Sequence, residues 1–467
     1  MSDTVLIIDQ GSHSTRALVF DGNGNVKGSS SVSVDTVFPA SGFIEQNPET
    51  VLSSVFAAID ALVSDITAIS KAALIVQRSS LLACRKDSLK PLTNIISWQD
   101  TRNRECIMAL HDYHDNMNAI TGLRPNAHYG ASKMRWLLDN DQAVQQAAKE
   151  HNLLFVPLAA WLASRITASL VCRVDPVIAS RTLLMSLEQV EWNAQLLSWF
   201  GIDTTMLPEI VDSESNFGSL DIKGHPVPLT LVGGDQSFIA FAYGKSINPD
   251  IAYVNVGTGA FVQMLRPSDQ DDKALLSSPL VINQHEKVIV KEGTVNAAAT
   301  ALDWLWGQAG KTLSYDQLEV IMKHCVDVPV FINTIAGIGS PWWLSAQEPV
   351  FIGAGSIEQK AVAVIESIVF GLQDNIERLK SINLKLSKIV IGGGLSRSDR
   401  FCQKLADLSG LVVVRPKMHE ISALGAACYL MPQMEADMGP LNNFEPGNND
   451  ELLRRYHRYG KAIQQLM

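Results

Sequence analysis

The sequence predicts an α/β fold with a weak internal duplication, on three observations. Runs typical of buried strands alternate with helical runs along most of the chain. The chain has 467 residues, a length that allows two or three domains. Hairpins whose turns are rich in glycine and hydroxyl residues open both halves, at residues 5–20 and again at residues 251–265.

Composition narrows the classes of function. Apolar residues make up 46% of the chain and charged residues 18%, as in ordinary soluble globular proteins. A net charge of −10 argues against general nucleic-acid binding, although local N–H groups, arginine and Mg²⁺ can still hold a nucleotide. The six cysteines form no CxxC pair, and neither a membrane-spanning run nor a signal peptide is recognisable. We therefore expect a cytoplasmic protein with reduced thiols and no membrane partner.

In the first half, the predicted order is strand, hairpin, helix, strand and helix. Residues 4–10 read as a strand and residues 16–34 as a hairpin. A helix is expected from Pro48, with Asn47 as its N-cap. Its apolar face comprises Val51, Leu52, Val55, Phe56, Ile59, Leu62 and Val63. The last two elements are a buried strand at residues 71–77 and a short helix at residues 130–140.

The second half repeats the alternation. Residues 229–244 read as strand, turn and helix, and residues 251–265 as strand, turn and strand. A long helix is expected over residues 355–382, with a capping box from Ser356 to Gln359. The last predicted elements are a strand, glycine turn and helix at residues 387–410 and a polar helical tail from about Pro432.

The first hairpin turn carries residues suited to a phosphate group. Its sequence is DQGSHSTR, residues 9–16. Glycine permits a tight turn with inward N–H groups, and the hydroxyls add further donors. Asp9, at the end of the strand, can orient Mg²⁺ or its waters. A plain polar hairpin is the alternative explanation.

A second carboxylate follows two glycines in the segment GGDQ, residues 233–236. Asp235 stands at the end of a predicted strand and projects from the edge of the sheet. That position suits a general base that takes a proton from a hydroxyl group. A solvated aspartate in a turn is the alternative.

Two further glycine turns lie in the second half. Gly257-Thr258-Gly259 is rich in donors, and Gly392-Gly393-Gly394 lets a flat ring approach the backbone. The glycine triplet also fits strand–helix packing or a Rossmann nucleotide site. The order of the four segments favours a nucleotide clamped between two lobes. Such a layout suits phosphoryl transfer, in which catalysis is mostly positioning and charge stabilisation.

Longer stretches of the chain resemble the FGGY family of carbohydrate kinases and look most like its glycerol kinase branch. The matching segments, in the family's order, are IDQGSHSTRALVFD, GFIEQNPE, ISWQDTRN, TGLRPNAHYGASKMRWLLDN, DPVIASRTLL, GGDQ, VGTGAF, KEGTV, GIGSPWW, IGGGLSRSDRFCQKLADLSG and RPKMHEISALGAACYL. The resemblance implies two actin-like (ribonuclease H-like) domains with a ligand cleft between them. The expected divisions are an N-terminal domain at residues 1–240, a C-terminal domain at residues 241–432, and a helical tail at residues 433–467.

The resemblance implies ATP and Mg²⁺ as cofactors and indicates which residues contact them. Asp235 falls on the family's catalytic base, and Asp9 together with Asp235 falls on the metal site. The residues implied in nucleotide binding are Gly11, Ser12 and Arg16 in the first phosphate loop, Thr258 and Gly259 in the second, and Gly393, Gly394 and Ser398 at the adenine.

The implied substrate pocket departs from the glycerol kinase pattern. Its residues are Arg78, Ser79, Trp98, His128, Asp235, Gln236 and Phe261. Ser79 stands where glycerol kinases carry a glutamate, His128 replaces a tyrosine, and His13 replaces a threonine of the phosphate loop. The missing carboxylate favours a bulkier or differently hydroxylated substrate than glycerol. The alternatives are that Arg78 pairs with Asp100, that Trp98 is ordinary core, and that His128 is a loop histidine.

The expected function is ATP-dependent phosphorylation of a hydroxyl group of a small polyol or sugar. A homodimer is expected because glycerol kinases are often oligomeric. One alternative is a ketopentose or other sugar kinase similar to xylulokinase or ribulokinase. Another is a non-catalytic regulator that binds sugar and nucleotide, although Asp9 and Asp235 argue against it. A third alternative is a chaperone-like or filament-forming actin relative, which would not need the GGDQ carboxylate. A Rossmann enzyme is the least favoured, because its glycine fingerprint would follow the first strand, and none is present there.

Overall fold

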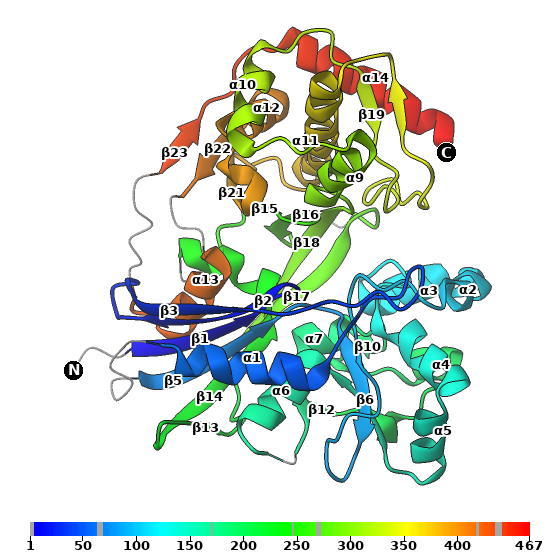
Figure 1. Cartoon of the computed structure of the whole chain (residues 1–467), viewed down its shortest axis with the longest axis vertical. Coiled ribbons are helices and arrows are strands. Elements are labelled where there is room, and N and C mark those ends of the chain that lie inside the picture. The colour runs from blue at the N-terminus through cyan, green and yellow to red at the C-terminus, as the bar shows by residue number, and fades with distance from the viewer. Residues whose placement is uncertain are drawn as a thin grey trace. The chain divides into compact units, whose positions relative to one another are not determined.

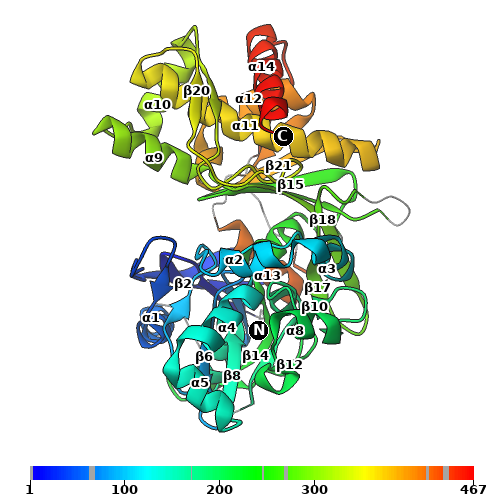
Figure 2. The same ribbon diagram turned by 90° about the vertical axis from the view of Figure 1, so that its right-hand side faces the viewer.

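The computed structural model describes residues 4–62, 69–169, 171–244, 247–267, 272–416, 420–434 and 441–467. These residues form two compact units (Figures 1 and 2). The N-terminal unit comprises the described residues of Met1–Ile247, Ser277–Ile289 and Glu420–Asp437. The C-terminal unit comprises those of Asn248–Leu276, Val290–His419 and Met438–Met467.

A six-stranded mixed sheet forms the centre of the N-terminal unit. In spatial order its strands are β13 (Ser219–Ile222), β14 (His225–Gly234), β5 (Ile69–Val76), β1 (Thr4–Gln10), β2 (Ser14–Phe20) and β3 (Val26–Ser33). β14, β5 and β1 are parallel, whereas β2 and β3 are antiparallel to their neighbours. Both faces of β1 are buried, as expected for a parallel strand covered by helices on both sides.

Helices cover both faces of this sheet. Helix α1 (Pro48–Asp60) and helix α6 (Leu158–Ile166) pack on one face, and helix α13 (Ile421–Leu430) packs on the other (Figure 1). Asn47 caps α1 as predicted, since its side chain accepts a hydrogen bond from the Thr50 amide at 3.0 Å. The prediction for Phe56 is wrong: it is 43% exposed, because the buried face follows Val51 and its i+4 and i+8 neighbours. Val63 lies outside the described residues.

Smaller elements complete the N-terminal unit. A second sheet has the order β4 (Glu45–Gln46), β7 (Ile95–Ile96), β6 (Leu81–Arg85) and β8 (Leu153–Pro157). Two-stranded sheets pair β10 (Met185–Ser186) with β11 (Glu191–Trp192) and β12 (Glu209–Ile210) with β9 (Arg173–Val174). The remaining α-helices are α2 (Arg104–Ala109), α3 (His114–Thr121), α4 (Gly130–Asn140), α5 (Gln142–Lys149), α7 (Pro176–Ser180) and α8 (Ala194–Phe200).

A seven-stranded sheet forms the centre of the C-terminal unit. Its order is β17 (Leu276–Ile282), β18 (Lys287–Val295), β16 (Ala260–Leu265), β15 (Ile251–Val256), β21 (Lys388–Gly392), β22 (Val412–Arg415) and β23 (Asn442–Phe444). Almost all of β17 and the first residues of β18 lie within Ser277–Ile289, which belongs to the N-terminal unit. β22, β21 and β15 are parallel, and β16 and β18 continue the sheet as antiparallel strands. The sheet of the N-terminal unit has the same pattern of three parallel strands followed by two antiparallel ones. The predicted internal duplication is therefore confirmed.

The helices of the C-terminal unit pack around one long buried helix. They are α9 (Ala299–Ala309), α10 (Tyr315–His324), α11 (Ile357–Ile382), α12 (Asp399–Ser409) and α14 (Asp450–Leu466), beside a strand pair β19 (Val330–Ile332) and β20 (Val350–Ile352). The capping box of α11 is present as predicted, from Ser356 to Gln359. The predicted tail forms α14, but it also contributes the edge strand β23, which the sequence did not predict. Among the described residues, no helix is long and apolar enough to cross a membrane.

Candidate active site

Three neighbouring parallel strands bring several predicted site residues to one edge of the N-terminal sheet. Gln10 of β1, Val76 of β5 and Gly234 of β14 lie side by side in register. Arg78 follows the end of β5, and Asp235 follows the end of β14. The predicted turn between strand and helix is absent, because Asp235 begins a 3-10 helix, η4 (Asp235–Tyr243), directly after β14. Ligands of open α/β sheets bind at this carboxyl edge, so the topology supports a site here.

Two carboxylates influence each other at this edge. Burial and the negative charge of Asp235 raise the pKa of Asp9 to about 7, against the opposing charge of Arg16. Burial also raises the pKa of Asp235, while the positive charges of Arg78 and Arg181 and the amide of Gln236 act in the opposite direction. The Gln236 amide donates to Oδ1 of Asp235 at 2.7 Å. The Asp235 carboxylate is therefore oriented by the backbone and faces positive charge.

The same two carboxylates fit a hard divalent cation. Their mutual repulsion would be relieved by a cation, and carboxylate oxygens are ligands that Mg²⁺ accepts. No group of three or more His, Cys, Asp or Glu side chains that could hold a metal occurs among the described residues. Mg²⁺ usually binds through one or two carboxylates together with waters and substrate phosphates, so two carboxylates are a sufficient protein contribution.

The glycines before Asp235 make room for neighbouring side chains. A Cβ atom on Gly233 would lie 2.9 Å from the ring of Phe238, and one on Gly234 would lie 2.7 Å from Cγ of Arg78. Arg78 is buried, and its charge acts on Asp235. Asp100, the alternative partner considered for Arg78, is held by Arg102.

The predicted first phosphate loop is fixed by bonds from several segments of the N-terminal unit. The Gly11 amide donates to the Ser14 carbonyl at 3.0 Å, which closes the turn between β1 and β2. The Ser12 hydroxyl donates to Oε1 of Gln77 at 3.1 Å and accepts from Nε1 of Trp98 at 2.9 Å. Gln46 donates to the Ser12 carbonyl at 2.9 Å. The loop is thereby tied directly to Trp98, a residue of the predicted substrate pocket.

Arg16 projects from β2 directly opposite Asp9 in the hairpin register. Its Nη1 lies 2.6 Å from Oε2 of Glu420, which precedes α13, and both side chains keep about a third or more of their surface exposed (43% and 34%). The sequence prediction did not include Glu420. No local signal could have found this pair, because the two residues are 404 positions apart.

A buried cluster of glutamines supports the loop and also escaped the sequence prediction. Nε2 of Gln77 donates to Oε1 of Gln46 at 2.9 Å and to Oε1 of Gln10 at 3.2 Å. All three side chains are buried. The cluster joins β1, β4 and the residue that follows β5 beneath the turn.

The predicted pocket residues Trp98 and His128 lie next to each other. Nδ1 of His128 lies 3.1 Å from the carbonyl oxygen of Trp98, and the two ring centroids are 6.5 Å apart. Both residues are half-buried. Trp98 is thus less buried than Trp161 of the core, which favours the predicted pocket role over a place in the core. Burial and the charge of Lys133 lower the pKa of His128 to about 4.

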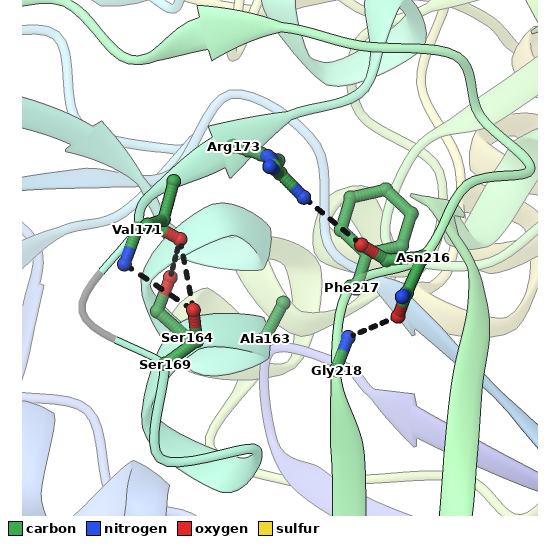
Figure 3. A pocket seen from close by; sticks show the side chains of 8 residues that line it. All are labelled: Ala163, Ser164, Ser169, Val171, Arg173, Asn216, Phe217 and Gly218. Carbon is green, nitrogen blue, oxygen red and sulfur yellow. Dashed lines mark hydrogen bonds between the residues drawn. The ribbon is translucent and has the colours of Figure 1, made fainter.

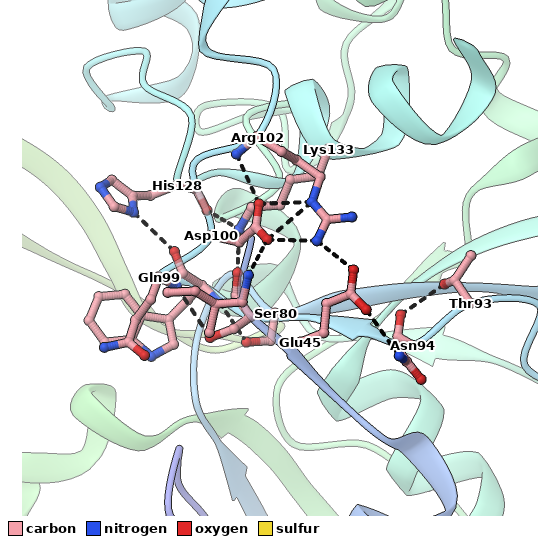
Figure 4. A network of polar contacts seen from close by, with 12 residues as sticks. Glu45, Ser80, Thr93, Asn94, Gln99, Asp100, Arg102, His128 and Lys133 are labelled. Carbon is pink, nitrogen blue, oxygen red and sulfur yellow. Dashed lines mark hydrogen bonds and ion pairs between the residues drawn. The ribbon is translucent and has the colours of Figure 1, made fainter. Parts of the chain in front are cut away.

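A polar network holds the loop that carries Trp98 (Figure 4). Arg102 donates to both oxygens of Asp100, at 2.9 Å from Nε and 2.7 Å from Nη2, and reaches Glu45 at 2.6 Å. Lys133 of α4 is fully buried and donates to the carbonyls of Ser97 and His128, each at 2.8 Å. The sequence prediction missed Lys133, since a lysine in an amphipathic helix usually reads as a surface residue.

Ser79, which replaces the expected glutamate, has an unusual backbone. It is half-buried and adopts φ 66°, in the left-handed region that side chains other than glycine rarely occupy. Such conformations cost about 1–3 kcal/mol and cluster at functional sites. Nine other non-glycine residues of the described chain also have a positive φ, so the backbone alone does not mark Ser79 as a site residue.

The predicted nucleotide residues of the C-terminal unit lie at the ends of two neighbouring parallel strands. Asn255 of β15 is in register with Gly392 of β21. The Thr258 carbonyl accepts from the Ala298 amide at 2.8 Å, which fixes the turn between β15 and β16. Gly393 has φ 91°, and a Cβ atom there would lie 2.5 Å from the Val256 carbonyl oxygen.

The other predicted residues of this unit are placed as follows. Ser398 is buried and caps α12, because its hydroxyl accepts from the Phe401 amide at 3.0 Å. Phe261 is half-buried on β16. Gly259 lies close to the backbone of Val295, where a Cβ atom would approach the carbonyl oxygen to 3.1 Å.

A small cavity of about 170 Å³ occurs elsewhere in the N-terminal unit (Figure 3). It is lined by Ala163, Ser164, Ser169, Val171, Arg173, Asn216, Phe217 and Gly218. None of these is a predicted site residue. Nη1 of Arg173 donates to the Asn216 carbonyl at 3.1 Å, whereas its buried Nε has no hydrogen-bond partner among the described residues.

Comparison with known proteins gives consistent matches along the chain. The sequence models of the FGGY family of carbohydrate kinases match residues 4–242 with the N-terminal domain and residues 252–432 with the C-terminal domain. Glycerol kinase of Aquifex aeolicus is 28% identical, with 91% of this chain and 88% of the relative covered. Glycerol kinase of Thermococcus gammatolerans is also 28% identical, with 100% and 98% covered.

Solved structures match the fold. Plasmodium falciparum glycerol kinase with ADP gives a TM-score of 0.84 at 21% identity, covering 100% of this chain and 98% of the other. Xylulose kinase from Rhodospirillum rubrum gives a TM-score of 0.83 at 18% identity, and the match covers 99% of each chain. These matches confirm the predicted class, an α/β protein with two actin-like domains.

Proposed function

The chain belongs to the FGGY family of carbohydrate kinases and is an ATP-dependent phosphotransferase that acts on an alcohol group of a small polyol or sugar; within that activity, we propose that Asp235 is the general base. The observation that carries this proposal is the placement of Asp235 at the carboxyl end of β14. There the carboxylate faces the charge of Arg78 and is oriented by the Gln236 amide. Arg78 favours the ionised form, which a base requires.

The proposed reaction is an in-line displacement. The carboxylate of Asp235 accepts the proton of the substrate hydroxyl as that oxygen forms a bond to the γ-phosphorus. The bond from this phosphorus to the β,γ-bridging oxygen breaks, and ADP leaves. The amide of Ser12 and the guanidinium of Arg16 stabilise the charge on the transferred group. Gly11 shapes the turn that holds them, because its amide donates to the Ser14 carbonyl. A bound phosphate would compete with Glu420 for Arg16, since the two anions use the same guanidinium.

Asp9 and Asp235 are the proposed Mg²⁺ contacts. When bound, Mg²⁺ would neutralise charge on the nucleotide phosphates. The carboxylates of this chain would hold the ion through oxygen or through its waters, as their mutual influence on pKa supports.

The remaining nucleotide contacts are proposed from the C-terminal unit. Thr258 and Gly259 would contact phosphate, and Gly393, Gly394 and Ser398 would lie at the adenine. The proposal for Gly393 rests on the family resemblance, because the space beside this glycine is taken by Val256 and Asn255 of β15. Functionally, we divide the chain into residues 1–240 for substrate and base, residues 241–432 for the nucleotide, and a tail at residues 433–467.

The substrate contacts are proposed at Arg78, Ser79, Trp98, His128, Gln236 and Phe261. Glycerol is disfavoured because Ser79 offers no carboxylate to accept hydrogen bonds from its hydroxyls. A ketopentose or a larger polyol is the second candidate, supported by this loss of charge and gain of space. The test is ADP release from Mg·ATP across a panel of polyols and ketoses. One stimulating compound identifies the substrate class, whereas stimulation by glycerol above all others would contradict the role given to Ser79.

We also propose a cytoplasmic homodimer that binds neither nucleic acid nor membrane. The net charge of −10 supports the first of these exclusions. Sedimentation of the purified chain would test the dimer.

A further inference from the structure

We propose that His128 determines substrate specificity as a neutral hydrogen-bond acceptor, whose Nε2 receives a hydroxyl of an uncharged polyol or ketose. This inference rests on the proposed function, because it deepens the description of the same pocket. The acceptor would replace the carboxylate that Ser79 lacks.

The first step concerns the proton on Nδ1. Nδ1 of His128 lies 3.1 Å from the carbonyl oxygen of Trp98. A carbonyl oxygen can only accept a hydrogen bond, so Nδ1 must carry the proton. In a neutral imidazole the other nitrogen then has a free lone pair. The geometry thus makes Nε2 an acceptor.

The second step concerns the charge of the ring. His128 is half-buried beside the ammonium group of Lys133, whose Nζ donates to the His128 carbonyl at 2.8 Å. Burial opposes protonation of the ring most strongly, and the charges of Lys133 and Arg104 oppose it as well. The Trp98 carbonyl and Asp100 favour protonation, but they do not outweigh these effects. Asp100 is already neutralised by Arg102. These surroundings keep the imidazole neutral at ordinary pH.

The third step concerns position. Lys133 bridges the carbonyls of Ser97 and His128, so it joins the loop of Trp98 to the loop of His128 (Figure 4). The indole of Trp98 in turn donates to Ser12 in the first phosphate loop at 2.9 Å. His128 is therefore held at a fixed place relative to that loop. No contact from Nε2 to another protein group is present within the parts of the chain that the structure describes.

The chemistry of an acceptor selects the substrate class. A hydroxyl group can donate to Nε2, whereas a carboxylate placed there would set two acceptors against each other. A site built to bond a substrate hydroxyl also rejects an analogue that lacks it. Sugar acids such as gluconate should therefore be poor substrates, and neutral polyols or ketoses should be good ones.

The tautomer is tested first, on the intact protein and without any turnover. Long-range ¹H–¹⁵N NMR of ¹⁵N-histidine-labelled protein at pH 7, assigned with the His128→Asn variant, shows which ring nitrogen carries the proton. We expect a neutral ring with the proton on Nδ1. A proton on Nε2, or a charged ring, would overturn the inference even if the chain is an active kinase.

Kinetics test the contact itself, with glycerol, xylitol, D-xylulose and gluconate as probes. His128→Asn keeps a donor near the position of Nδ1 but removes the acceptor at Nε2, whereas His128→Gln can reach that position. For the compound that best promotes ADP release, we expect KM to rise at least tenfold in His128→Asn and less in His128→Gln. The KM for ATP should change less than twofold. An unchanged KM in His128→Asn, or a preference for gluconate, would refute the contact. If no probe is phosphorylated, the substrate panel fails while the NMR result still decides the tautomer.

Discussion

Arg78 lies directly against the backbone of Gly234: a Cβ atom added to that glycine would lie 2.7 Å from Cγ and 2.9 Å from Cδ of the arginine. The next residue is Asp235, whose carboxylate is influenced by the charge of Arg78. The missing side chain at position 234 therefore allows the guanidinium stem to pass beside the carboxylate. This packing explains why a glycine precedes the proposed base.

Gly234→Ala should displace Arg78 and weaken substrate binding. Overpacking of this kind costs about 1–3 kcal/mol, which denaturant unfolding would measure. We expect a higher KM for the substrate and little change in ATP affinity. Gly460→Ala, on α14, is the matched control, because an added Cβ atom there would have nothing within 4 Å. It should leave the substrate KM and the ATP affinity unchanged. A normal substrate KM in Gly234→Ala would show that Arg78 does not need this position.

Gly393→Ala should impair nucleotide binding rather than substrate binding. The residue has φ 91°, and a Cβ atom would lie 2.5 Å from the Val256 carbonyl oxygen. We expect the affinity for ATP, measured by calorimetry, to fall at least tenfold. Gly410→Ala is the control that separates backbone strain from steric contact. Gly410 also has a positive φ, of 67°, but an added Cβ atom would have nothing within 4 Å. Equal ATP affinity in the two variants would argue against an adenine contact at Gly393.

Ser79→Glu should move the preference toward glycerol. It restores an anionic acceptor, and a hydrogen bond to a charged group contributes about 1.5–3 kcal/mol. We expect kcat/KM for glycerol to rise about tenfold, which corresponds to roughly 1.4 kcal/mol. Ser79→Ala is the control for loss of the hydroxyl alone. An unchanged substrate profile would place the specificity elsewhere in the pocket.

His128 should make the stability of the protein depend on pH. Its pKa in the folded chain is about 4, below the ordinary value of 6.5, so between these values the unfolded chain binds more protons. The free energy of unfolding should therefore fall as the pH drops from 6.5 to 4, by roughly 2 kcal/mol for a half-buried group. The free energy of unfolding, measured with denaturant at each pH, should fall by about 2 kcal/mol more in wild type than in His128→Asn between pH 6.5 and pH 4. Parallel curves would show that the imidazole titrates normally.

Much of the fold could be predicted from local sequence. The strand ends at Asp9 and Asp235 follow apolar runs, and Asn47 and Ser356 cap helices by side-chain bonds to nearby amides. These features depend on residues a few positions apart. The prediction of the buried face of α1 is wrong at Phe56, because the apolar residues of this helix extend beyond the surface that is buried.

The long-range contacts that hold the site residues in place could not be predicted from local sequence. Glu420 reaches Arg16 from the far end of the chain, and the bond from Trp98 to Ser12 joins two loops that are 86 positions apart. The burial of Lys133 depends on two carbonyl groups that only the folded loops bring together. Long-range contacts of this kind follow from topology, which one sequence pattern does not specify.

The central claim is that Asp235 is the base of the transfer, and one comparison tests it most directly. ADP release from Mg·ATP would be measured for wild type and Asp235→Asn, with the panel compound that best stimulates the wild type. The asparagine keeps the shape of the side chain but cannot accept the proton. We predict that turnover falls about 10²–10⁴-fold while ATP affinity, measured by calorimetry, stays within twofold. Turnover above a tenth of the wild-type rate would contradict the assignment.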